Sequence, residues 1–266
     1  MNFLFASSGP HVSLPAELMF TIGPLHVYNS QLLGLLGTLT LIGMFWYAAS
    51  RIKQRKYNRF VVMMLMGYEM LLNTVEEVMG DRTKARQLAP LAITLFFVIM
   101  INNWMGLLPF VGPLTYNGQP LFRGLASDLN FTAALAIITM VTAQVWAVKT
   151  HGFFGNLGRY FGNPFKDPIH AVEGFLELIA EFSRLIALAM RLFGNVFGGE
   201  ILLLAMAFIT SWAATIALPP FMLLELFVGA VQAYVFFMLL VVFVALASSH
   251  HEEAEERPAN TVAATH

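Results

Sequence analysis

Residues 185–200 read LIALAMRLFGNVFGGE and place a single arginine, Arg191, far inside a long apolar stretch. A guanidinium group keeps its proton at any accessible pH. Placing it in the middle of a bilayer costs about 2.5–3.5 kcal/mol on insertion scales. A charge in such a position indicates a functional site, and the apolar sequence around it indicates a membrane helix.

The composition of the whole chain supports a membrane protein. Of its 266 residues, 58% are hydrophobic and 12% are charged, and there is no Cys. Several apolar stretches are long enough to cross a hydrocarbon layer of about 30 Å. We therefore expect an all-α polytopic protein of five to six helices, forming one membrane domain over residues 1–266. A chain without Cys has no disulfide, thiol nucleophile or thiolate-ligated metal, and we expect no cofactor and no nucleic-acid partner.

The apolar segments predict where the chain crosses the membrane. Three candidate spans are Gln31–Ser50, Leu88–Phe110 and Phe131–Val148. In Phe60–Met79, acidic residues are mixed with apolar ones, which favours an amphipathic helix near the membrane surface over a span.

Basic residues set the expected orientation. Eight Lys and Arg residues lie between 51 and 86 and three between 149 and 166, against none in 1–27 and only Arg123 between 111 and 130. Basic loops stay in the cytoplasm. This predicts an external N-terminal tail, residues 1–27, which lacks the charged start of a secretory signal, and a cytoplasmic C-terminal tail, residues 251–266.

The last third of the chain predicts a helical hairpin. The run from Ile169 to about Ala213 is about twice as long as a perpendicular crossing needs. Pro219–Ala247 then returns across the membrane. We expect a long tilted hairpin over about 169–250, with its turn near residue 212 on the outer side.

Small residues line the helix face that carries the arginine. At 100° per residue, the positions within about 60° of Arg191 are Arg184, Ala187, Gly194, Asn195 and Gly198. Small residues four apart allow another helix to approach closely. This face is therefore predicted to meet another protein helix, whereas Glu200 points to the opposite side.

Polar residues on the two arms of the hairpin are predicted to form layers. A turn near 212 brings Arg191 level with Gln232 and Glu200 level with Glu225, roughly 10–14 Å apart along the helix. A third polar stripe on the cytoplasmic side steps by four residues: Glu173, Glu177 and Glu181.

This arrangement suits a membrane path for a proton or a small cation. Acids lead inward from each surface, and a fixed positive charge between them repels a cation that would leak straight through. Two carboxylates at one level, Glu200 and Glu225, would also tend to share a proton.

Simpler interpretations remain open for each polar element. The stripe of Glu173, Glu177, Glu181 and Arg184 can be a surface helix with side-chain pairs three or four residues apart. Glu200 or Glu225 can be neutral and hydrogen-bonded as part of the packing. Arg191 has no acid three or four residues away, so a purely structural role is less favoured for it.

Other functional classes are also considered. An intramembrane enzyme using Glu200 and Glu225 as an acid/base pair lacks an accompanying nucleophile and an H-E-x-x-H metal motif. A self-contained cation transporter should show inverted repeats, and none is visible. A purely structural assembly subunit is the remaining alternative.

The motifs resemble one family. Arg191-Leu-Phe-Gly-Asn195, Gly199-Glu200, Gln232-Ala233 and Ala247-Ser248-Ser249 closely resemble the a subunits of F-type ATP synthases. The similarity extends to Ala89-Pro90-Leu91-Ala92, Asn103 to Leu107-Leu108-Pro109, Ser127-Asp128-Leu129-Asn130 and Asn163-Pro164. No G-x-x-x-x-G-K-[ST] loop is present, so nucleotide chemistry must belong to a partner.

The resemblance implies a non-catalytic stator channel in a bacterial plasma membrane. Arg191 would be the essential charge facing the ring of c subunits, and the remaining F0F1 complex would include b-type stalk subunits. The pathway residues it implies are Glu200 and Glu225 in the outer half-channel, Asn195, Gln232 and Asn103 in the polar lining, and Glu177 in the inner half-channel. Two positions depart from the family pattern: Glu225 is His in some members, and Gly106 replaces an acid sometimes found there.

Overall fold

The structure, a computed structural model, describes residues 17–22, 25–108, 111, 114–116, 119–153, 155–156 and 168–249. Most of the expected external tail and all of the expected cytoplasmic tail lie outside these residues. The helices are α1 (Asn29–Lys53), α2 (Arg59–Met79), α3 (Arg82–Gly106), α4 (Leu129–His151), α6 (Pro168–Thr210) and α7 (Ala214–Ser249), with the 3₁₀ turns η1 (Leu125–Ser127) and η2 (Ser211–Ala213).

The predicted all-α polytopic class is confirmed. Four segments are long and apolar enough to cross a membrane: α1, α3, Leu129–Thr150 of α4, and Val172–Ser248 across the α6–α7 hairpin. Helix α2 is not among them, as expected for an amphipathic helix. Two short antiparallel hairpins were not predicted: β1 (Leu18–Ile22) with β2 (Leu25–Tyr28), and β3 (Thr115–Tyr116) with β4 (Gln119–Pro120).

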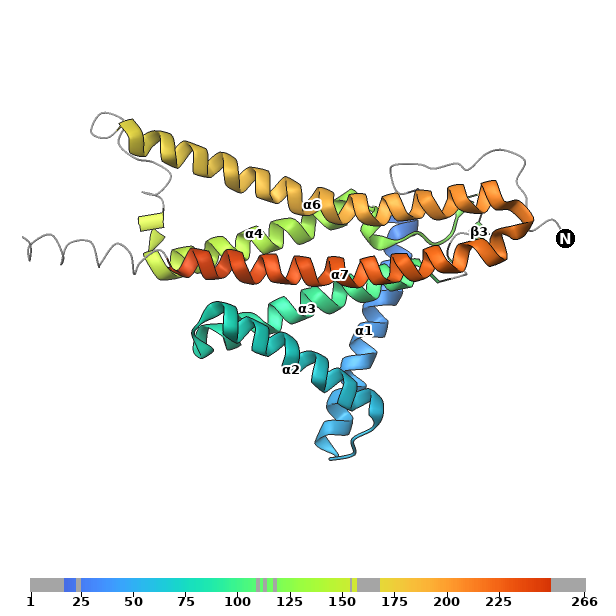
Figure 1. Ribbon diagram of the computed structural model, residues 1–266, viewed down its shortest axis with the longest axis horizontal. Helices are drawn as coiled ribbons and strands as arrows, with labels where there is room; N and C mark the ends of the chain where they lie inside the picture. The colour runs from blue at the N-terminus through green and yellow to red at the C-terminus, as the bar shows by residue number, and fades with distance from the viewer. Residues whose placement is uncertain are drawn as a thin grey trace, which may run out of the picture.

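The α6–α7 hairpin is the longest part of the molecule, and it turns at η2, where the sequence predicts the turn. The 43 residues of α6 extend over about 65 Å, so a hairpin of this length must lie strongly inclined in a layer of about 30 Å. Figure 1 shows α6 and α7 side by side near the turn and further apart at the other end, where α4 lies beside them.

Helix α7 begins earlier than predicted, at Ala214, so that Pro219 and Pro220 lie inside it. Proline lacks an N–H group and cannot donate to the carbonyl four residues back. Membrane helices tolerate such gaps because neighbouring groups compensate for the lost bonds. The prolines therefore did not mark the start of the helix.

Helix α3 also differs from its predicted span: it begins at Arg82 and ends at Gly106. The side chain of Asp81 accepts hydrogen bonds from the backbone N–H groups of Thr83 and Lys84, which is the N-cap arrangement. Gly80, with φ of 67°, ends α2 in the left-handed conformation that favours glycine. Capping thus sets this boundary, and hydropathy does not.

The core lies where α3 packs against α7. On α7 the buried residues recur at spacings of three and four, which places them on one face: Ala233, Phe236, Phe237, Leu240, Val241 and Val244. Phe96 of α3 meets Phe237 edge to face, with ring centroids 6.2 Å apart. This packing fixes α7 against the rest of the protein and leaves the opposite side of the hairpin uncovered.

The N-terminal ends of α1 and α4 meet at the same end of the molecule. The Ser30 hydroxyl donates to Asp128 at 3.1 Å, and the Asn29 side chain donates to the Pro120 carbonyl at 3.3 Å. Ser30 and Asn29 are completely buried. These bonds join α1 to the segment that carries β4 and η1.

Candidate functional site

Arg191 lies on the uncovered side of α6. Its residue is exposed, while its neighbours Leu188, Ala189 and Leu192 are buried against the protein. Among the described residues, Arg191 has no hydrogen bond or ion pair. In this chain the guanidinium therefore points outward, with its charge unmatched.

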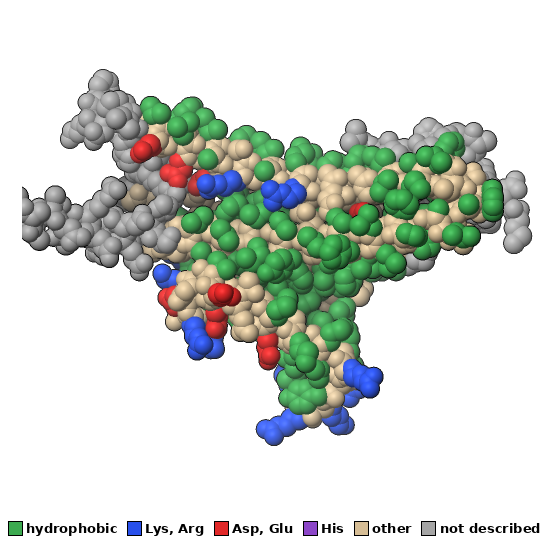
Figure 2. Space-filling view, in the orientation of Figure 1, with side chains coloured by type: hydrophobic (Ala, Val, Ile, Leu, Met, Phe, Trp, Pro, Cys, Tyr) green, Lys and Arg blue, Asp and Glu red, His purple; other side chains and the backbone are tan. Residues whose placement is uncertain are grey.

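The small residues beside Arg191 are equally open. A Cβ atom added to Gly194 or Gly198 would meet no atom within 4 Å. Figure 2 shows basic side chains on the middle of the hairpin, within a surface that is mainly apolar or small. No described helix of this chain covers the face formed by Ala187, Arg191, Gly194 and Gly198, which we call the open face of α6.

Glu225 lies where the hairpin register predicts, at the level of Gly199 and Glu200. Its carboxylate packs directly on Gly199, and a Cβ atom on that glycine would overlap it. Gly199 is buried. The glycine at this position thus makes the room that the acid occupies between α6 and α7.

Glu200 points away from the open face and meets an arginine that the sequence interpretation had used only for orientation. Its Oε2 lies 3.6 Å from Nε of Arg123. Arg123 is 5% exposed, its Nε donates to the Ser127 hydroxyl at 3.0 Å, and its guanidinium lies 5.7 Å from the Phe197 ring centroid. A lone charge between the apolar pairs Leu121-Phe122 and Leu125-Ala126 was the available signal for a buried arginine.

The two outer acids have different contacts in the structure. No hydrogen bond joins the carboxylates of Glu200 and Glu225 among the described residues. The ion-pair partner of Glu200 is Arg123, and Glu225 lies over Gly199. The two acids share a level, as expected, but they differ in their surroundings.

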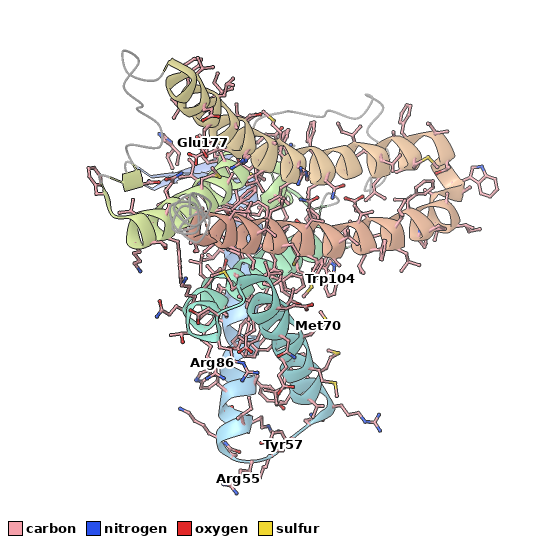
Figure 3. The ribbon with its side chains drawn as sticks, turned by 60° about the vertical axis from the view of Figure 1, so that its left-hand side comes forward. Arg55, Tyr57, Met70, Arg86, Trp104 and Glu177 are labelled. Atoms are coloured by element: carbon pink, nitrogen blue, oxygen red, sulfur yellow. The ribbon has the colours of Figure 1, made fainter. Side chains whose placement is uncertain are left out.

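Two of the other predicted lining residues are buried near α7. Gln232 is 8% exposed and Asn103 is 6% exposed, and the Asn103 amide donates to the Gly229 carbonyl at 3.4 Å. Figure 3 shows Trp104 at the end of α3 next to α7, where its Nε1 donates to the Leu226 carbonyl at 3.1 Å. Asn195 is partly exposed on α6.

Gly106 packs closely against the loop before η1. A Cβ atom at this position would lie 3.4 Å from the Gly124 backbone. This is an ordinary van der Waals contact, and nothing in the structure explains the departure from the family pattern at Gly106.

The inner acidic stripe borders a cavity between α4, α6 and α7. The cavity has a volume of about 160 Å³, and its polar lining consists of Gln144, Glu177, Glu181 and Arg184. The Gln144 amide donates to both carboxylate oxygens of Glu181, at 2.7 and 2.8 Å. Figure 3 shows Glu177 near the end of α6 that lies away from the turn.

Arg184, at the edge of this cavity, lies with its guanidinium 5.6 Å from the Phe243 ring centroid on α7. The contact of Arg184 with Phe243 and the contact of Gly199 with Glu225 show which residues of α6 and α7 lie opposite each other at two places along the hairpin. Between these two places, Arg191 lies level with α7 residues near 234–235, two to three residues beyond Gln232, the residue predicted at its level. Along the hairpin, the structure thus places Glu200 and Glu225 nearest the turn, Arg191 in the middle, and the polar cavity furthest from the turn.

The described residues contain no group of three His, Asp or Glu side chains placed to hold a metal ion. What the arrangement offers chemically is a set of carboxylates at two depths, separated by an unmatched cation on a surface free for a partner.

Comparison with known proteins gives consistent matches over most of the chain. Residues 32–245 match the family described as ATP synthase A chain. The chain is 30% identical over 218 residues to ATP synthase subunit a 2 of Photobacterium profundum, which covers 80% of this chain and 85% of the relative. It is 29% identical over 229 residues to ATP synthase subunit a of Acinetobacter baylyi, covering 78% and 77%. It is 32% identical over 187 residues to ATP synthase subunit a of Campylobacter concisus, covering 69% and 75%.

Proposed function

Since the chain belongs to the ATP synthase A chain family and is a multi-pass membrane protein, we propose that it is the proton-conducting stator of an F-type ATP synthase. It provides two offset half-channels, which load and unload carboxylates on a rotating ring of c subunits. The observation that supports this most directly is the exposed, unmatched Arg191 on the open face of α6. A carboxylate on another chain would explain a cation that has no partner among the described residues of its own chain.

The outer half-channel leads past Glu225 and Glu200 to the ring. A proton that enters from outside reaches the level of Glu225 and passes to a ring carboxylate near the open face. Gln232, Asn195 and Asn103 provide polar groups along this part of the path. The neutralised carboxylate can then move into the lipid, since a protonated acid avoids the cost of a charge in hydrocarbon.

The inner half-channel is the cavity that Glu177 lines. When a protonated ring carboxylate returns towards Arg191, the guanidinium favours its ionised form, and the proton leaves through this cavity. The open face lies between the two paths, so a proton crosses only by travelling with the ring. A membrane potential supplies about 2.3 kcal/mol per charge per 100 mV, so several protons are needed for each ATP.

The remaining assignments follow from the same proposal. The N-terminal tail 1–27 is external, the tail 251–266 is cytoplasmic, and the chain forms one membrane domain in a bacterial plasma membrane. The basic residues between 51 and 86 then face the cytoplasm. The subunit binds the c-ring and b-type stalk subunits, performs no chemistry alone, and uses no cofactor and no nucleic acid.

ATP synthesis in membrane vesicles that carry the intact complex tests this function. Arg191→Ala should reduce synthesis to the background of vesicles that lack the subunit, because the ring carboxylate would lose the cation that it meets in the middle of the open face. Arg59→Ala is the matched control, since Arg59 is exposed at the start of α2, and it should retain synthesis. Normal synthesis by Arg191→Ala at a normal subunit level would refute the proposal.

A further inference from the structure

The buried arginine of the outer layer has no role in the path described so far. Arg123 is 5% exposed, and its side chain is held by the Ser127 hydroxyl, the Phe197 ring and the Glu200 carboxylate. A charge this deeply buried is expensive unless it is paired. The ion pair between Arg123 and Glu200 therefore indicates a role for both residues.

The charged groups around Glu200 are few. Arg123 approaches it from the segment before η1, and Glu225 on α7 packs against the neighbouring residue, Gly199. The second half of α3, residues 95–106, contains no charged residue. Asp128, which follows η1, is bonded to Ser30 and caps α4. Arg123 is thus the counter-ion that the described structure gives to Glu200.

Glu200 and Glu225 differ in the free-energy cost of neutralising the carboxylate. If Glu200 became neutral, the buried guanidinium of Arg123 would lose the ionised carboxylate beside it, which is unfavourable in a protein interior. Glu225 has no ion pair or hydrogen bond among the described residues. It can gain or lose a proton without leaving an opposite charge unpaired.

We propose that Arg123 is a positioning residue of the outer half-channel: it holds Glu200 as a fixed negative charge, so that Glu225 is the acid of this layer that exchanges protons. The Arg123–Glu200 pair then has no net charge and fixes the position of Glu200 and of the loop before η1. Glu225, packed on Gly199, transfers the protons. This inference rests on the proposed stator function and divides the roles of two residues within it.

Reciprocal substitutions in the intact complex test the pairing, with ATP-driven proton uptake into inverted vesicles as the readout. Arg123→Gln should lower proton uptake at least about tenfold, because Glu200 loses its counter-ion. Adding Glu200→Gln should raise uptake several-fold above that of Arg123→Gln alone. The matched control, Arg123→Gln with Glu225→Gln, should show no recovery. Wild-type uptake by Arg123→Gln, or equal uptake by the single and the Glu200 double variant, would overturn the proposal.

If Arg123→Gln fails to assemble, the amount of subunit in the membrane tests the pairing instead of proton uptake. The Glu200 double variant should then restore the subunit level measured by immunoblot, because it removes the unpaired charge. A double variant that accumulates no better than Arg123→Gln would contradict the pairing.

The pH dependence of proton uptake distinguishes the exchanging acid from the fixed one. Imidazole titrates near pH 6.5 and an ordinary glutamate near 4.3, so Glu225→His should displace the pH profile upward. Glu200→His should lower uptake without displacing the profile, since it places a second cationic group beside Arg123. A displaced profile for the Glu200 variant alone would reverse the assignment. The two proposals can fail separately. If Arg191→Ala abolishes ATP synthesis but Glu200→Gln does not restore proton uptake to Arg123→Gln, this inference is refuted and the stator function still holds.

Discussion

Arg191 and Arg123 have opposite surroundings. Arg191 is exposed on the open face of α6, with glycines beside it and no partner in the described chain. Arg123 is buried on the other side of α6, against Glu200, Ser127 and Phe197. The guanidinium group of Arg191 thus faces out of the subunit, whereas that of Arg123 faces the interior.

The contrast shows how the surroundings of a charge indicate its purpose. A buried pair whose groups meet each other fixes a structure, since removing one member leaves the other uncompensated. An unmatched charge in an apolar surface is stable in a complex only if another molecule supplies the opposite charge or a water-filled path. The adjacent residues Gly198 and Gly199 show the same division, because one is open and the other is covered by Glu225.

The largest expected effect comes from filling the open face. Gly198→Trp places a large side chain where an added Cβ meets nothing in this chain, so the subunit should accumulate normally but lose almost all ATP synthesis, because the ring can no longer approach. Gly43→Trp is the matched control, since Gly43 is also exposed in a membrane helix with open space around it. Synthesis is measured in vesicles and the subunit level by immunoblot. Unimpaired synthesis by the Gly198 variant would mean that this face has no close partner.

A smaller substitution separates the two adjacent glycines. Gly199→Ala introduces a methyl group into the position of the Glu225 carboxylate and should lower synthesis about tenfold by displacing that acid. Gly198→Ala adds the same methyl group in open space and should change synthesis by less than about twofold. Equal effects of the two alanines would break the distinction between the open and the packed side of α6.

Much of this arrangement can be predicted from the sequence, because the hydrophobic pattern is long and simple. The symmetric spacing of Arg191 with Gln232 and of Glu200 with Glu225 placed the turn near 212, and the structure turns at Ser211–Ala213. The acids within Phe60–Met79 indicated an amphipathic helix, and α2 is not among the segments suited to span.

What the sequence pattern missed depends on contacts between distant segments. Arg123 reads as a loop residue until the fold brings it to Glu200, which lies 77 positions away in the chain. The N-cap at Asp81 and the prolines inside α7 moved helix boundaries, because local hydrogen bonding decides where a helix begins. The room that Gly199 makes for Glu225 is a packing property, and single-helix periodicity carries no information on it.

A moderate effect is expected at the inner cavity, where an acid is held from inside the chain. Gln144 donates to both oxygens of Glu181, so Gln144→Leu should remove these two hydrogen bonds from the carboxylate and lower synthesis about threefold. Thr142→Val is the control, since the Thr142 hydroxyl bonds only to the Ile138 carbonyl of its own helix, and it should leave synthesis unchanged. A Gln144 variant with wild-type rates would show that this acid, unlike Glu200, needs no positioning group.

The smallest effect is expected at Asp81, the exposed N-cap residue of α3. Unlike Arg191 and Arg123, Asp81 is solvated, so its substitution measures what a solvent-exposed charge contributes to stability. Hydrogen bonds from the Thr83 backbone N–H hold the pKa of Asp81 below its ordinary value of 3.8. A lowered pKa means that the contribution to stability is present above about pH 3.8 and is lost as the pH falls through the folded-state value. Asp81→Ala should lower the unfolding temperature of the detergent-solubilised complex by about 2 °C at pH 7, and Asp81→Asn, which can still cap the helix but carries no charge, should restore it in part. The difference between wild type and Asp81→Ala should narrow between pH 5 and about pH 3. A constant difference over that range would show that the carboxylate charge plays no part in the cap.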